Sequence, residues 1–127
     1  MTAKPPYRLG DLQLRIMKIL WSAGPVAVAD VHRELGTDAF AYSTMATMLR
    51  KMEARGLVRH REEDRRFIYE ASVGAEDVAR HAVDDLVDRL FEGNLADAVN
   101  HLLENRDVSR KELERLEQMI RERKNRR

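Results

Sequence analysis

Hydrophobic residues recur at helical spacing through the first half of the chain. From Leu9 they return every three or four positions as far as Gly24-Pro25, a pair that ends helices. The same spacing runs from Val28 to Leu35 and from Ala41 to Val58, so we predict three helices before residue 58. The expected buried face of the third helix consists of Met45, Met48, Leu49 and Met52.

The next segment has the character of strands. Leu57–Arg61 and Phe67–Ala71 contain aromatic and β-branched residues, and the charged stretch from Glu62 to Arg65 lies between them. This pattern predicts a β-hairpin with a polar, exposed tip. Two helices joined by a short loop and followed at once by a hairpin are typical of the winged helix-turn-helix.

After Gly74 the pattern is helical again. Apolar stripes lie on residues 78–91, 95–103 and 113–120, and Ser109 with Glu112 has the spacing of a capping box for the last helix. Short helices cannot bury such stripes alone, so we expect some to pack across a two-fold axis. The alternative is a monomer with a three-helix cap. The expected shared core is Leu86, Leu90, Phe91, Leu102, Leu103, Leu113, Leu116 and Ile120.

Composition narrows the class of protein. The 127 residues include no cysteine, which excludes disulfides and thiolate metal sites and fits a reducing cytoplasm. No apolar run approaches the roughly 20 residues of a membrane span, and the first ten residues lack a signal-peptide core. We therefore expect a soluble, cytoplasmic protein that does not insert into membranes.

Charge is unevenly distributed although the net charge is only +1. Residues 43–61 hold five bases and one acid, whereas residues 74–105 hold two bases and eight acids. The third predicted helix lies in the basic segment and has no acid before Glu53. This polarity suits a polyanion on one side of the molecule only.

Hydroxyl residues crowd the start of that helix, although they are mediocre helix formers. In a helix-turn-helix the second helix points its N-terminal residues into the major groove, where donors and acceptors meet base edges and acids would repel phosphates. The alternative is that Ser43 and Thr44 are only helix caps. Wing arginines commonly reach the flanking backbone, whereas a solvated turn with ion pairs inside the hairpin is the alternative there. The expected DNA-binding residues are Tyr42, Ser43, Thr44, Thr47, Arg50, Lys51, Arg61, Arg65 and Arg66.

Catalytic and metal patterns are weak. The four histidines have no metal-ligand spacing, and His81 with Asp84, Asp85 and Asp88 reads better as a solvated acidic face than as a helical metal site. No Ser/His/Asp grouping, phosphate loop or paired-acid pocket is present. We therefore expect no enzyme activity, no cofactor and no metal.

The chain resembles the penicillinase-repressor family, which includes BlaI and MecI and is related to the copper-responsive CopY repressors. The matching stretches are LGDLQLRIMKILW, VADVHREL, AYSTMATMLRKMEARGLV, RRFIYEA, LVDRLFEGNL and KELERLEQMI. The resemblance implies a homodimeric repressor of the antibiotic response that binds a dyad operator. It also implies inactivation by cleavage in the C-terminal region, triggered by a membrane sensor protease and made by that or a downstream protease.

Two features depart from the family pattern. CopY-type members end in a cysteine-rich copper site, which a chain without cysteine excludes. The bond cleaved in BlaI and MecI is Asn-Phe, whereas the aligned pair here is His101-Leu102, with Asn100-His101 one step earlier. The possible cleavage site therefore comprises Asn100, His101 and Leu102.

These observations predict a mainly α fold with a small β-hairpin wing. We expect a flexible leader over residues 1–8, a winged helix-turn-helix DNA-binding domain over 9–73 and a helical dimerisation region over 74–127. The expected function is sequence-specific transcriptional repression. The alternatives are a winged-helix regulator that releases DNA on binding a small ligand, and a winged helix used only for protein–protein contact.

Overall fold

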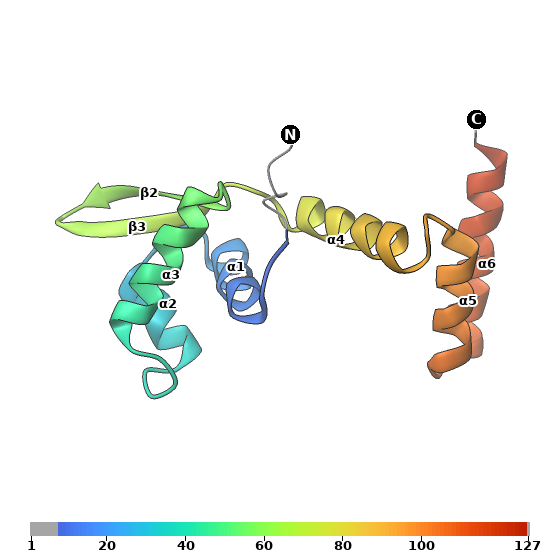
Figure 1. Ribbon diagram of the computed structural model, residues 1–127, viewed down its shortest axis with the longest axis horizontal. Coiled ribbons are helices and arrows are strands. Elements are labelled where there is room, and N and C mark those ends of the chain that lie inside the picture. Colours follow the sequence, from blue (N-terminus) through green and yellow to red (C-terminus); the bar gives the residue numbers. More distant parts are fainter. Residues whose placement is uncertain (1–7, 127) are drawn as a thin grey trace. The chain divides into compact units, whose positions relative to one another are not determined.

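The computed structural model describes residues 8–126, so most of the expected leader lies outside the described residues. Within residues 8–126, six helices and three short strands follow one another, and Figure 1 shows how the chain runs through them. The elements are α1 (Asp11–Ala23), β1 (Val26–Ala27), α2 (Val28–Leu35), α3 (Tyr42–Ala54), β2 (Val58–Glu63), β3 (Arg66–Ala71), α4 (Ala75–Leu90), α5 (Leu95–Asn105) and α6 (Arg110–Asn125). The mainly helical class with a small sheet is confirmed.

The three strands form one antiparallel sheet in the order β1-β3-β2. The two-residue strand β1 directly follows Pro25 and pairs Val26 with Tyr69. In the hairpin, which we call the wing (β2, β3 and their turn), Glu63 pairs with Arg66. The turn is therefore only Asp64-Arg65, tighter than the four residues expected from the sequence. Both residues adopt positive φ, 50° and 65°, which allows a two-residue connection between twisted strands.

One hydrophobic core joins α1, α2, α3 and the sheet. The expected inward positions of α2, Val28, Val31 and Leu35, are all buried. On α3, Met45, Leu49 and Met52 are buried, whereas Met48 is only partly buried. The largest fully buried side chains of this core are Tyr69, Ile16, Met17, Met45, Leu49, Met52, Leu57, Val31 and Val58.

Two polar contacts fix the ends of the helices in this core. Asp30 Oδ2 accepts a hydrogen bond from the Ala27 backbone N–H (3.0 Å), which caps the start of α2. Trp21 Nε1 donates to the Val73 carbonyl (2.8 Å) and so ties α1 to the segment that follows β3. The helices α2 and α3 and the wing therefore pack together on one hydrophobic core, which they share with α1.

The chain divides into two compact units, one ending at Asp85 and the other beginning at Leu86. The division falls within α4, twelve residues after the expected boundary between residues 73 and 74. In the second unit the Asn94 side chain caps α5 by accepting from the Asp97 N–H (2.9 Å). Ser109 Oγ caps α6 by accepting from the Glu112 N–H (3.0 Å), as the capping pattern predicts.

Candidate nucleic-acid interface

The exposed side of α3 begins with the polar residues that the sequence singled out. Its N-cap is Ala41, which has no side chain that could accept a hydrogen bond from the first helical N–H groups. Ser43 and Thr44 are therefore not the N-cap. They are the second and third residues of the helix, and both are exposed. No acid occurs in the first turn. An anion approaching this helix end meets hydroxyls and backbone N–H groups without repulsion.

Four of the expected DNA-binding residues meet in one place on α3. Ser43, Thr44, Thr47 and Lys51 line a shallow depression of about 250 Å³, together with Met48. Three hydroxyls and one ammonium group supply both donors and acceptors, which is the chemistry that base edges and phosphates require. Arg50 extends the polar surface sideways, because its Nη2 donates to Thr47 Oγ1 (3.1 Å).

Arg61 lies in ion pairs within the wing. Its guanidinium donates to Glu63 and forms a second ion pair with Glu70 (3.2 Å). The bonded Glu63 carboxylate and, to a lesser extent, Glu70 raise the pKa of this guanidinium. Arg61 therefore fits the alternative of ion pairs inside the hairpin. Because two carboxylates already pair with its guanidinium, it is less available to a phosphate than Arg65 or Arg66.

Arg65 and Arg66 lie at the wing tip and face a different environment. Both line a groove of about 280 Å³ between α3 and the wing, which we call the wing groove. Tyr42 and Arg50 of α3 line the same groove, so it brings together four of the nine expected DNA-binding residues. Sequence reasoning missed Phe67, which also lines it. The remaining lining residues are Ala27, Val28, Ala29, Ala46 and Tyr69.

His32 positions the entrance to α3. Its Nε2 lies 2.7 Å from the Phe40 carbonyl oxygen, within hydrogen-bonding distance. Its ring also contacts the Tyr42 ring in a T-shaped arrangement, with the centroids 5.9 Å apart and nearly perpendicular planes. Through these two contacts α2 fixes both the loop before α3 and the first side chain of α3.

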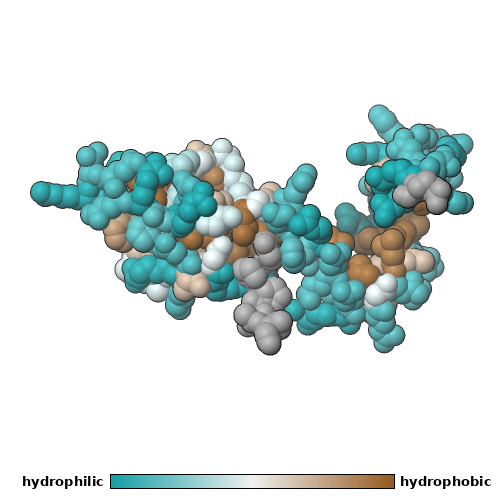
Figure 2. Space-filling model, turned by 90° about the horizontal axis from the view of Figure 1, so that it is seen from above, coloured by the Kyte–Doolittle hydropathy of each residue, from teal (hydrophilic) through white to brown (hydrophobic). Residues whose placement is uncertain are grey.

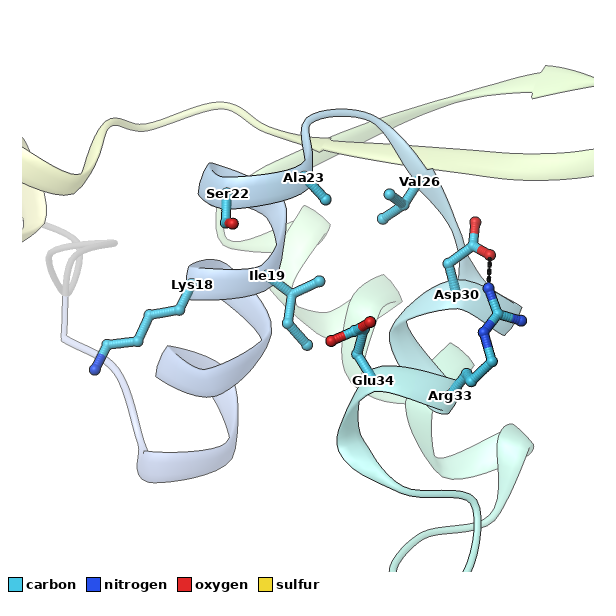
Figure 3. A pocket seen from close by; sticks show the side chains of 8 residues that line it. All are labelled: Lys18, Ile19, Ser22, Ala23, Val26, Asp30, Arg33 and Glu34. Atoms are coloured by element: carbon cyan, nitrogen blue, oxygen red, sulfur yellow. Dashed lines mark hydrogen bonds and ion pairs between the residues drawn. The ribbon is translucent and has the colours of Figure 1, made fainter.

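A larger depression, of about 420 Å³, lies on another part of the winged helix, between α1 and α2 (Figure 3). Lys18, Arg33, Asp30 and Glu34 give it mixed charge, and Arg33 is paired with Asp30 (Figure 3). The Ala27 N–H and then Arg33 hold the pKa of Asp30 below its usual value. Because its cations are matched by anions, this depression is a poor match for a polyanion.

The apolar residues expected at a dimer interface are largely exposed in the single chain. Exposed fractions are 47% for Leu86, 70% for Leu90 and 57% for Ile120. Figure 2 shows such apolar side chains on the surface of the C-terminal helices. Leu102, Leu103 and Leu113 are exposed as well, whereas Phe91 and Leu116 are half-buried.

The possible cleavage residues lie in the middle of α5. Asn100, His101 and Leu102 all have helical backbone and are exposed. The His101 ring contacts Phe91, with centroids 5.8 Å apart. Only Ala98 of α5 is buried, so little core holds this helix in place.

Residues 8–126 contain neither a cluster of metal-ligating side chains nor a membrane-spanning helix. No group of three or more His, Asp or Glu side chains in that range could hold a metal ion. Within the same range, no helix is long and apolar enough to cross a membrane.

Comparison with known proteins agrees with this geometry. The family model described as penicillinase repressor matches residues 9–122. The chain is 29% identical to the penicillinase repressor of Bacillus licheniformis over 120 residues, which cover 94% of each chain. It is 34% identical to the transcriptional regulator BlaI of Mycobacterium tuberculosis over 100 residues, 76% of this chain and 72% of that one.

A solved structure matches the N-terminal part. The solution structure of the DNA-binding domain of the repressor BlaI aligns with a TM-score of 0.51 and 28% sequence identity, covering 60% of this chain and 93% of that one. The winged-helix assignment is thereby confirmed. Since the family match extends from the winged helix through the C-terminal helices, this chain belongs to the penicillinase repressor family, whose members are DNA-binding transcriptional regulators and not enzymes.

Proposed function

We propose that this repressor binds a dyad operator as a homodimer, with one α3 in the major groove of each half-site. The exposed, acid-free start of α3 carries this proposal. Thr44, Thr47 and Lys51 read base edges, because a hydroxyl can donate or accept and an ammonium group donates to guanine acceptors. Ser43 and the first N–H groups of α3 bind a phosphate and so set the register of the helix on the duplex.

The wing contributes affinity without base specificity. Arg65 and Arg66 contact phosphates that flank the major groove, and Arg50 binds the backbone between them and α3. These charge-assisted contacts release counterions and make binding depend on salt. Arg61 contributes less than Arg65 or Arg66, because Glu63 and Glu70 already pair with it.

Dimerisation occurs through the C-terminal helices. The exposed leucines of α4, α5 and α6 support this, since contiguous apolar surface of this kind marks an association site. The single chain leaves the apolar residues of α5 and α6 largely exposed. A second copy covers them by presenting the same stripes across a two-fold axis.

Cleavage within α5 separates the two half-sites and relieves repression. A protease acts on opened chain, and a helix with one buried residue opens at low cost. A cut near Asn100-His101 or His101-Leu102 detaches α6 together with Leu113, Leu116 and Ile120. A membrane sensor protease, directly or through a second protease, provides the cut.

The test is a footprint of the purified protein on the DNA upstream of its own gene. We expect two protected segments related by two-fold symmetry, about one helical turn or a multiple apart. The test variant is Thr44→Ala combined with Thr47→Ala, which should lose the symmetric footprint because each good base contact contributes about 1–3 kcal/mol of discrimination. Its retained binding to non-specific DNA serves as the control for folding. An unchanged footprint from the double variant would exclude α3 as the reading helix.

A further inference from the structure

We propose that the wing groove holds the sugar-phosphate backbone of one DNA strand, and that Phe67 contacts a deoxyribose of that strand. This inference rests on the proposed function and assigns a DNA contact to a residue that carries neither charge nor a hydrogen-bonding group. The occupant follows from the lining of the groove, from the exposure of its aromatic side chains and from the shape of duplex DNA.

The lining of the wing groove selects an anionic occupant with apolar parts. Three guanidinium groups, those of Arg50, Arg65 and Arg66, belong to the lining, and no carboxylate does. The rest of the lining is alanine, valine and aromatic surface. A sugar-phosphate chain has this composition, with a charged phosphate and an apolar deoxyribose edge in alternation.

The two exposed aromatic residues point to the same groove. Among the described residues of the winged helix, from α1 to β3, Tyr42 and Phe67 are the large apolar side chains that remain exposed, at 51% and 43%. Both line the wing groove although they come from different elements. The neighbours of Phe67 on β3, Ile68 and Tyr69, are buried. Two exposed aromatic side chains in one groove provide apolar contact for its occupant.

A chain of contacts from α3 holds Phe67 in its position. The His60 ring packs against the Phe67 ring with centroids 4.4 Å apart, and against Tyr69 at 5.3 Å. His60 Nδ1 in turn lies 2.7 Å from Glu53 Oε1 near the end of α3. Glu53 of α3 therefore holds His60, and His60 in turn holds Phe67. These contacts fix the distance between α3 and the Phe67 ring.

The shape of duplex DNA requires a strand at this place. Each major groove is separated from the next minor groove by one sugar-phosphate backbone. With α3 in the major groove and the wing tip beside the flanking backbone or minor groove, that strand passes between α3 and the wing. The wing groove is the depression found between these two elements.

The experiment uses the full chain and a mixed-sequence duplex, because a backbone contact does not require the operator. Phe67→Ala should bind this duplex about tenfold more weakly, as expected when roughly half of a phenyl ring loses apolar burial. The slope of log K against log salt should equal that of the wild type, because no cation is removed. Phe67→Tyr, which keeps the ring, should bind like the wild type. On the operator, hydroxyl-radical cleavage of the deoxyribose protected in the wild type should return in Phe67→Ala.

Two results would overturn the inference. Unchanged affinity of Phe67→Ala would show that the ring makes no DNA contact. A weaker affinity accompanied by a shallower salt slope would show that Phe67 only holds Arg65 and Arg66 in place. The proposed function fails separately: if the wild type binds duplex DNA but gives no symmetric footprint, the dyad operator is wrong while the result for Phe67 still stands. A wild type that binds no duplex DNA would overturn both.

Discussion

The arginines of the wing differ in how much of their charge the protein already satisfies. Arg61 pairs with Glu63 and Glu70, and Arg59 Nε donates to Glu70 at 2.8 Å. Among the described residues 8–126, Arg65 and Arg66 make no such ion pair. A phosphate approaching Arg61 must compete with two carboxylates, whereas a phosphate approaching the tip meets exposed cations.

This difference predicts a different salt dependence for each arginine. Arg65→Ala combined with Arg66→Ala should weaken binding to all duplex sequences alike and lower the magnitude of the salt slope by roughly one for each phosphate contact removed. Arg61→Ala, the matched control, should change the slope little. Fluorescence anisotropy titrations at several salt concentrations measure both. A larger slope change for Arg61→Ala than for the double variant would reverse the assignment.

The residues whose surroundings could not be predicted from the sequence are those whose neighbours depend on strand register. The sequence allows ion pairs of Arg61 inside the hairpin but does not identify Glu70 as a partner, because Glu70 lies nine positions away and reaches Arg61 only through the pairing of β2 with β3. The sequence predicts a strand at Phe67 but not the exposure of its ring, for a related reason. Its exposure follows from a tight turn and from the placement of α3, neither of which a local pattern specifies.

At the scale of single elements, local signals were sufficient. Gly24-Pro25 ends α1, Ser109 caps α6, and the apolar spacing of α2 identified its three buried residues. Each depends on residues within one or two turns, so the sequence contains the whole interaction. The extent of the hairpin was less predictable, because a charged stretch can be either loop or exposed strand; here Glu62 and Glu63 continue β2.

The start of α2 depends on one half-buried carboxylate, that of Asp30. The Ala27 N–H and Arg33 both stabilise its ionised form and lower its pKa. A carboxyl whose pKa is lower in the folded state contributes stability above its unfolded pKa of about 3.9, and that contribution disappears as pH falls through the folded value.

Replacement of Asp30 should therefore have a pH-dependent effect. Asp30→Asn should lower the melting temperature at pH 7, and the difference from the wild type should shrink as the pH falls below 4. Melting curves followed by circular dichroism between pH 3 and 7 check this. Asp38→Asn, in the loop between α2 and α3, is the control. Equal destabilisation by Asp30→Asn at both ends of the range would show that charge has no part in the cap.

At the scale of the whole molecule, the proposed mode of repression requires two weak half-site interactions acting together. One winged helix contacts few base pairs, and joining two raises affinity by roughly 10²–10⁴ without any new contact. Nearly all the core of the described chain lies in the winged helix, whereas Ala98 is the only buried apolar residue recorded from Leu86 onward. In the proposed dimer, the C-terminal helices would therefore gain far more buried surface from the partner than the winged helix does.

Truncation of the chain distinguishes the contribution of the winged helix from that of the C-terminal helices. A chain that ends after Asn100 should retain the circular dichroism and melting behaviour of the winged helix, sediment as a monomer at micromolar concentration, and bind the dyad operator about 10²–10⁴-fold more weakly. The full-length chain under the same conditions should sediment as a dimer. Full-length affinity in the truncated chain would show that operator binding does not require dimerisation.

In the Asp64-Arg65 turn, the residue type that best stabilises the fold at position 65 differs from the one expected to bind DNA best. An arginine at φ 65° adopts a backbone conformation that glycine adopts without penalty, and the strain amounts to about 1 kcal/mol. Evolution toward a sturdier fold would favour glycine or asparagine at position 65, whereas evolution toward tighter repression would keep the cation. A library varied at this codon should therefore split when sorted in two ways: heat resistance enriches glycine, and silencing of a reporter gene enriches arginine. Deep sequencing of the two sorted pools would show which demand has shaped the wing tip.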